Sequence, residues 1–105
     1  MDRINVENLK YQLDTGVSIY MLDVREPWEY QICRIEGSVN IPMSQIVNRM
    51  AELDKNATII VICHHGSRSY QVACYLESCG FSRLQNLEGG INAWASTIDK
   101  TMSSY

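Results

Sequence analysis

A cysteine at the end of an apolar run is the residue of this sequence with the clearest potential for chemistry. Cys63 follows the β-branched residues 59–62 and precedes a polar loop, 64–67, and Arg68. A thiol is a strong nucleophile only as the thiolate. Loop amides, the start of a following helix and the Arg68 guanidinium all favour a thiolate and a bound anion. We therefore interpret this loop as the active site, with Cys63 as nucleophile and Arg68 as substrate-binding residue.

The other loop residues have expected roles that follow from their types. Gly66 permits a positive φ, which lets the backbone close around a ligand. Ser67 or Ser69 can cap the next helix or donate a hydroxyl inward. His64 and His65 are expected to shape the rim, with acid–base catalysis as a lesser option. A zinc site is disfavoured, because adjacent side chains in a tight loop are expected to point apart.

Each of these interpretations has an alternative that involves no chemistry. Cys63 could be an inert buried thiol at a strand end, as many cysteines are. Arg68 could form an ordinary surface ion pair. The pattern favours the functional interpretation for both, because a cysteine, a glycine and an arginine stand together between a strand and a helix.

The strand that must carry Cys63 is buried on both faces, since residues 59–62 are all apolar and β-branched. From Ser69 onward, apolar residues recur at 72, 73, 76 and 79, which predicts a helix that ends at Gly80. A strand–loop–helix unit of this kind places the cysteine at the carboxyl end of a strand. Ligands of open parallel sheets bind at that edge.

The rest of the chain alternates between strand-like and helix-like spacing of its apolar residues. Strands are predicted at 4–5, 18–24, within 36–42 and at 81–87; helices are predicted at 6–13, at 28–32 after Pro27, at 44–53 with Ser44 as N-cap, and at 91–98. Residues 100–105 are expected to fray. This alternation is typical of an α/β domain with a mainly parallel sheet.

Composition narrows the classes of partner. The chain has 105 residues and a net charge of −3, which fits one domain without a basic patch for nucleic acid or an anionic membrane. No apolar leader precedes residue 5, and no stretch approaches the roughly 18 apolar residues of a membrane span. We therefore expect a cytoplasmic protein. Its four cysteines form no CxxC pair, which argues against zinc ribbons and dithiol exchange and predicts free thiols.

Four blocks of sequence resemble the rhodanese family, in the family's order. They are Leu22-Asp23-Val24-Arg25-Glu26-Pro27-Trp28-Glu29-Tyr30, Gly37-Ser38-Val39-Asn40-Ile41-Pro42, Cys63-His64-His65-Gly66-Ser67-Arg68-Ser69 and Leu87-Glu88-Gly89-Gly90-Ile91-Asn92-Ala93-Trp94. The resemblance implies one rhodanese-like domain over residues 1–105, with an ordered core at about 3–99, a five-stranded sheet and helices on both faces. It implies no cofactor.

The resemblance also implies a sulfurtransferase. In this family the loop cysteine takes a sulfane sulfur from a donor such as thiosulfate, forms a persulfide and passes the sulfur to a thiophilic acceptor, which is cyanide in the test tube and a thiol or protein otherwise. Related phosphatases have five residues between cysteine and arginine, whereas four stand between Cys63 and Arg68. The tighter ring suits a single sulfur atom. A sulfur-carrier or interaction module remains an alternative, and a phosphatase-like or thiol redox enzyme a more distant one.

One block departs from the family pattern. Cys33-Arg34-Ile35 stands where the family usually has Gly-His-Ile. Arg34 could assist an anionic donor at the rim. Cys33 could resolve a persulfide on Cys63 or form a regulatory disulfide with it, but a small buried thiol in a glycine position is the simpler interpretation.

Several remaining residues are interpreted as structural. Asp23 and Arg25 follow a neighbouring strand, where an ion pair that braces the loops is preferred over a place in the site, and Glu29 is likewise a brace. Aromatic residues at helical spacing predict core or pocket wall, and cysteines on the helix after the loop predict core thiols; these residues are Trp28, Tyr30, Trp94, Cys74 and Cys79. The sequence identifies neither the physiological donor and acceptor nor the oligomeric state.

Overall fold

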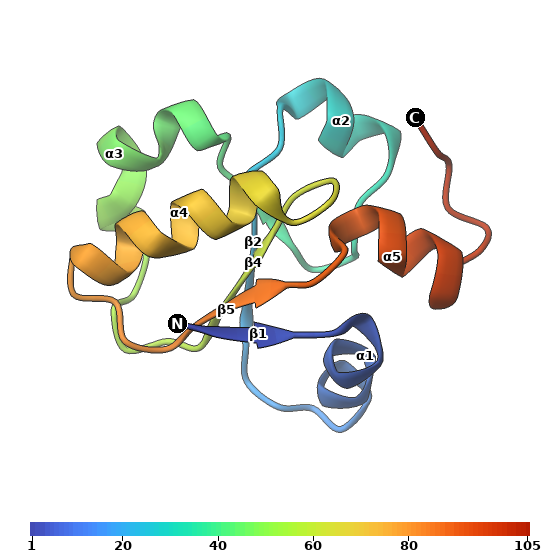
Figure 1. Ribbon diagram of the computed structural model, residues 1–105, viewed down its shortest axis with the longest axis horizontal. Coiled ribbons are helices and arrows are strands. Elements are labelled where there is room, and N and C mark those ends of the chain that lie inside the picture. Colours follow the sequence, from blue (N-terminus) through green and yellow to red (C-terminus); the bar gives the residue numbers. More distant parts are fainter.

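Five parallel strands form one sheet with the Cys63 strand at its centre. The computed structural model describes residues 1–105 (Figure 1). The sheet has the order β1-β5-β4-β2-β3, and every pairing is parallel. The strands are β1 (Asp2–Ile4), β2 (Tyr20–Asp23), β3 (Val39–Asn40), β4 (Ile59–Ile62) and β5 (Leu84–Leu87). All four residues of β4 are buried, as expected of a strand covered on both faces.

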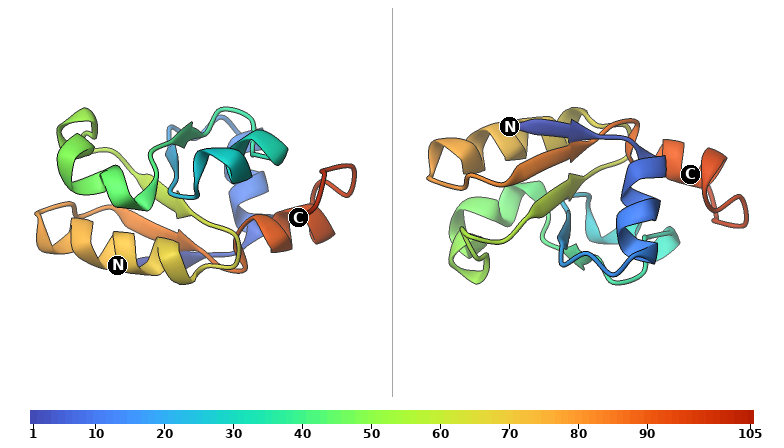
Figure 2. Two further views of the ribbon diagram at one scale, coloured as in Figure 1. Left: turned by 90° about the horizontal axis from the view of Figure 1, so that it is seen from above. Right: turned by 90° about the horizontal axis from the view of Figure 1, so that it is seen from below.

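Helices cover both faces of the sheet, and Figure 2 shows the domain from above and from below. One core layer joins β2 and β4 to α3 (Ile46–Arg49) and α4 (Ser67–Ser78). The other joins the opposite faces of these strands to α1 (Val6–Asp14) and α5 (Gly90–Thr97). A further helix, α2 (Pro27–Ile32), follows β2 at the carboxyl edge of the sheet. The predicted α/β class with helices on both faces is confirmed.

Strand register brings the ends of β2, β4 and β5 together. Asp23 pairs with Ile62, so the residues after β2 lie beside Cys63. Asn86 on β5 pairs with Val61, two residues before Cys63. The three strand ends therefore converge on the loop at residues 64–66.

The strands predicted at 18–24 and 81–87 are shorter, at Tyr20–Asp23 and Leu84–Leu87, and two other predicted elements differ more. The first strand lies at Asp2–Ile4 instead of 4–5, because the Asn5 side chain accepts a hydrogen bond from the Asn8 amide (2.8 Å) and starts α1. The helix predicted at 44–53 is broken into two 3₁₀ turns around α3. Ser44 lies within the first 3₁₀ turn and caps nothing. The stripe is narrower than expected, since Ile46 is buried whereas Val47 is 63% exposed.

The chain end, which the sequence predicts to fray, packs against α2. Residues 100–105 turn back from α5 toward α2 (Figure 1), and the Tyr105 ring packs edge-on against Trp28, with centroids 5.7 Å apart. Trp28 is 59% exposed, so of its two expected places, core or pocket wall, the core is wrong. Cys74 is also exposed rather than a core thiol, while Cys79 is half-buried against the core. No helix has the length and apolar character needed to cross a bilayer.

Candidate active site

Cys63 lies in the turn between β4 and α4, and its sulfur faces the loop. The residue is 1% exposed and packs beside Val24 and Ala73. The Gly66 amide donates a hydrogen bond to Cys63 Sγ at 3.0 Å. Because α4 begins at Ser67, the amides of its first turn lack partners within the helix and favour negative charge at this end. The sulfur is thus buried but held by a polar contact.

A buried polar pair supports the sulfur from the side of the sheet. Ser69 Oγ lies 3.3 Å from Cys63 Sγ and donates a hydrogen bond to Asn86 Oδ1. Asn86 Nδ2 donates in turn to the Gly66 carbonyl oxygen at 3.1 Å. With the Ser69 proton directed to Asn86, the Ser69 oxygen is free to accept the thiol proton of Cys63. Ser69 therefore points inward, which is one of its two expected roles.

Asn86 is one site residue that the sequence analysis does not single out. The sequence predicts it only as part of a strand, although a polar residue between Leu84 and Leu87 interrupts an apolar pattern. Asn86 is 6% exposed, and its amide contacts Gly66 in the loop and Ser69 in the first turn of α4. A buried asparagine near a strand end was the available signal, because buried amides require partners.

Two glycines allow the loop its path. Gly66 has a φ of +115° and is the N-cap of α4, the conformation expected for it. Gly90 has a φ of +55° and lies directly against the loop backbone, where a Cβ atom would stand 2.3 Å from the Cys63 carbonyl oxygen. The first amides of α5 complete this contact, since Ile91 and Asn92 donate to the carbonyls of Cys63 and His64 at 2.9 and 3.0 Å.

Arg68 is engaged by a carboxylate instead of standing free. Its Nη1 and Nη2 atoms lie 2.6 and 2.9 Å from the two oxygens of Glu29. These hydrogen bonds, more than any other contact, lower the pKa of Glu29 to about 2 and raise that of Arg68. The Glu29 side chain is 5% exposed and that of Arg68 34%. Arg68 therefore forms an ion pair, as in its alternative interpretation, but with a buried carboxylate rather than a surface one.

A second ion pair lies beneath the first. Arg25 and Asp23 are both fully buried, with Arg25 Nη2 2.8 Å from Asp23 Oδ2. Arg25 also donates to the Cys33 carbonyl oxygen at 2.6 Å, which ties the end of α2 to β2. This is the bracing arrangement preferred for Asp23 and Arg25. It does not reach the sulfur of Cys63 through any hydrogen bond.

Tyr105 covers the rim of the loop. Its ring stacks on the His64 ring, with centroids 4.2 Å apart and planes 21° apart. Its hydroxyl donates to Glu29 Oε2 at 2.8 Å and accepts from Arg25 Nη1 at 3.0 Å. Burial is the main cause that lowers the pKa of His64 and raises that of Tyr105, the latter to about 12. The tail thus contributes a residue that no motif indicated.

The two histidines do not point apart. Their ring centroids are 4.1 Å apart with the planes inclined by 31°, because the loop does not follow the alternation of a strand. His64 is half-buried and His65 exposed. Both lie at the rim, and Ser67 is exposed at the start of α4.

The residues of the divergent block lie on the far side of the sheet from Cys63. Cys33 is buried in the core layer of α1 and α5, whereas Cys63 belongs to the layer of α3 and α4, and all four cysteines are free thiols. Arg34 stacks over the Tyr30 ring (4.9 Å) and lines a cavity of about 500 Å³ between α1 and α5. The structure therefore does not bring Cys33 or Arg34 to the loop.

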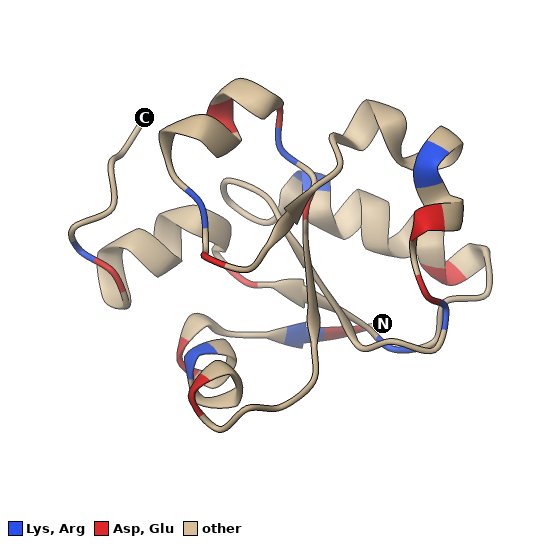
Figure 3. Cartoon of the chain, turned by 180° about the vertical axis from the view of Figure 1, so that it is seen from behind, with Lys and Arg blue, Asp and Glu red and all other residues tan.

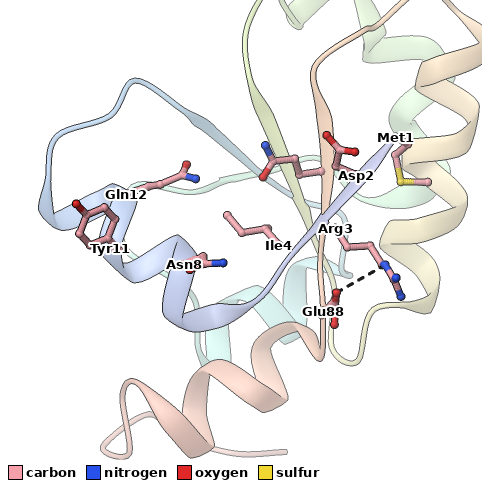
Figure 4. A pocket seen from close by; sticks show the side chains of 9 residues that line it. Met1, Asp2, Arg3, Ile4, Asn8, Tyr11, Gln12 and Glu88 are labelled. Carbon is pink, nitrogen blue, oxygen red and sulfur yellow. Dashed lines mark ion pairs between the residues drawn. The ribbon is translucent and has the colours of Figure 1, made fainter.

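The cavities and charged residues elsewhere do not indicate a second candidate active site. A larger cavity of about 750 Å³ lies at the outer edge of β1, lined by polar residues of β1 and α1 and by the Arg3–Glu88 ion pair, and it includes none of residues 63–69 (Figure 4). Basic and acidic residues are interspersed along the chain, as Figure 3 shows.

Comparison with known proteins gives a consistent result. The family model "Rhodanese-like domain" matches residues 5–97. A "Sulfurtransferase" from Allochromatium vinosum is 36% identical over 95 residues, which are 90% of this chain and 89% of that protein. A "Putative sulfur carrier protein YrkF" from Bacillus subtilis is 37% identical over 91 residues, 87% of this chain but 49% of that protein.

A solved structure agrees with the fold. The crystal structure of a rhodanese-like domain protein from Staphylococcus aureus has a TM-score of 0.85 and 33% identity, and the match covers 90% of this chain and 91% of that one. The family model matches most of the chain, and sheet order, loop and relatives agree with it. The chain therefore belongs to the rhodanese family.

Proposed function

We propose that this protein is a sulfurtransferase that carries a sulfane sulfur as a persulfide on Cys63. The observation that carries the proposal is the 3.0 Å hydrogen bond from the Gly66 amide to Cys63 Sγ, at the start of α4 and the end of the central strand. Donors aimed at a buried sulfur stabilise its anion before the reaction and the persulfide after it. Membership of a family with relatives named sulfurtransferase supports the same chemistry.

The reaction consists of two sulfur displacements. The Cys63 thiolate attacks the sulfane sulfur of a small anionic donor such as thiosulfate; a new S–S bond forms, and the old one breaks with its electron pair on sulfite. An acceptor, which is a thiol, a protein or cyanide, then attacks the outer sulfur of the persulfide. The Cys63–sulfur bond breaks and the thiolate returns. No net oxidation occurs and no cofactor is needed.

The other residues of the site stabilise the sulfur, bind the donor and border the entrance. The Gly66 amide donates to the reacting sulfur, and Ser69 can turn its hydroxyl from Asn86 to donate to the thiolate. Asn86 also accepts from Ser69 and donates to the Gly66 carbonyl, which positions both residues. Arg68 is the contact for the anionic part of the donor, which it reaches by exchanging the Glu29 carboxylate. The two histidines and Tyr105 bound the entrance.

Intact-mass measurement tests the proposal. Incubation with thiosulfate should add one sulfur atom to the protein, reversed by cyanide with release of thiocyanate. Cys63→Ser should lose both signals, while Cys74→Ser, which removes an exposed thiol, should retain them. Added sulfur on the Cys63→Ser protein would overturn the assignment of the nucleophile.

A sulfur-carrier role is the second candidate, because one relative is named a putative sulfur carrier. A persulfide that forms with a persulfide donor, persists, and turns over negligibly with thiosulfate would identify the carrier. Hydrolysis of an aryl phosphate that depends on Cys63 would instead support the phosphatase-like alternative.

A further inference from the structure

Each guanidinium beside the loop is matched by its own carboxylate. Arg68 is held by both oxygens of Glu29, and Arg25 by Asp23. Burial and the neighbouring His65 lower the pKa of His64, which favours its neutral form. The full charges around the entrance therefore cancel, and only the partial charges of the amides at the start of α4 remain to attract an anion.

We propose that Glu29 is a specificity residue that makes this site select singly charged sulfane-sulfur donors, the persulfide and thiosulfonate class, over the thiosulfate dianion. The proposal rests on the proposed function, because it concerns the donor that loads Cys63. Glu29 touches Arg68 and not the sulfur, so it acts by setting the charge that a donor meets.

The Glu29 carboxylate is fixed in place independently of Arg68. Its Oε1 accepts from the Glu26 amide at 2.9 Å and its Oε2 from the Tyr105 hydroxyl at 2.8 Å. Since the residue is also 4% exposed, it has no route into solvent when a donor arrives. A donor that takes Arg68 thus leaves an unpaired carboxylate close to its own negative charge. The repulsion acts on both charges of thiosulfate but on the single charge of a persulfide or thiosulfonate.

Thiosulfate and methanethiosulfonate provide a matched pair of donors. In both, the sulfane sulfur is bonded to an oxidised sulfur, and they differ by one charge. Attack by the Cys63 thiolate forms the same persulfide and releases sulfite from the first and methanesulfinate from the second, with the electron pair of the broken S–S bond on the leaving group. Any difference between them therefore reports mainly on charge and bulk.

The test compares the ratio of kcat/KM for thiosulfate to that for methanethiosulfonate in three proteins. The ratio cancels the fraction of active protein, so partial unfolding does not alter it. Glu29→Gln should raise it roughly tenfold, as expected for removal of one charge a few ångströms from the donor in a partly screened site. Glu36→Gln removes the same charge from an exposed residue that contacts neither Arg68 nor Glu29, and should leave the ratio within about twofold of the wild type.

Salt dependence provides a second measurement that needs no variant. In the wild type, kcat/KM for thiosulfate should stay constant or rise between low and physiological salt, because the entrance to the site carries no net positive charge that attracts the donor. A steep fall with salt, or an unchanged ratio in a folded Glu29→Gln protein, would overturn the proposal alone. If neither donor adds sulfur to Cys63, the proposed function fails and this inference fails with it.

Discussion

Gly90 provides a sharp test of how the fold shapes the loop. A methyl group at this position would stand 2.3 Å from the Cys63 carbonyl oxygen and 2.6 Å from that of His64. Both are backbone atoms that already accept hydrogen bonds from α5, so neither can move without loss. Gly90→Ala should therefore destabilise the domain and displace the segment that carries the nucleophile.

The magnitude has two parts. An alanine at a φ of +55° costs about 1 kcal/mol, and overpacking against backbone costs a further 2 kcal/mol or so. The expected loss of unfolding free energy is thus about 3 kcal/mol, or roughly 12 °C in melting temperature for a chain of this size. Relief of the clash requires a shift of roughly 1 Å, which typically lowers a rate about 100-fold.

Gly16→Ala is the matched control. Gly16 has a φ of +76°, but nothing lies within 4 Å of the position its Cβ would take. This variant should lose only the backbone part, about 1 kcal/mol, and should load sulfur on Cys63 at the wild-type rate. Thermal melts and the rate of sulfur addition by mass check both proteins. A Gly90→Ala protein as stable and as active as Gly16→Ala would refute the argument that close packing against α5 sets the loop.

Three further predictions concern the contacts within and around the loop. Ser69→Ala and Asn86→Ala should each lower the free energy of unfolding in urea by about 1–3 kcal/mol. Because the two residues share one buried hydrogen bond, the loss in the double variant should differ from the sum of the single losses by at least about 0.5 kcal/mol. Additive losses would contradict the pairing. The low pKa of Glu29, about 2 against a usual 4.5, stabilises the fold above pH 4.5 and ceases to do so as the pH falls toward 2. The difference in unfolding free energy between the wild type and Glu29→Gln should shrink over that range, and a constant difference would contradict it. The raised pKa of Tyr105, about 12 against 10, stabilises the fold below pH 10, and this is lost as the pH rises to 12. Tyr105→Phe should lack that loss, and matching curves for the two proteins would contradict the burial of the phenol.

The sequence predicted the features that depend on local pattern. The apolar run 59–62, the glycine at 66 and the stripe at 72, 73 and 76 each follow from periodicity or from a turn requirement, and each lies in the structure where it was expected. The expected number of strands in the sheet came from the family resemblance. Element ends were less accurate, because capping by Asn5 and the weak 44–53 stripe depend on a few contacts.

Features that depend on distant pairs were out of reach. Asn86 joins the site only because β5 lies next to β4, which brings it within hydrogen-bond distance of Gly66 twenty residues away. Tyr105 reaches Arg25 across 80 residues of chain, in a tail whose composition indicated fraying. The engagement of Arg68 by Glu29 was likewise invisible, because the two residues lie on different helices.

The contact between the loop carbonyls and the first amides of α5 makes amide exchange in α5 sensitive to the conformation of the loop. Ile91 and Asn92 can exchange their amide protons with solvent only when the oxygens of Cys63 and His64 release them. Any event that reshapes the turn around the sulfur, whether loading, oxidation or the arrival of an acceptor, must therefore register in deuterium uptake at those two positions. Amide exchange in α5 would therefore report on changes around the Cys63 sulfur without any modification of Cys63.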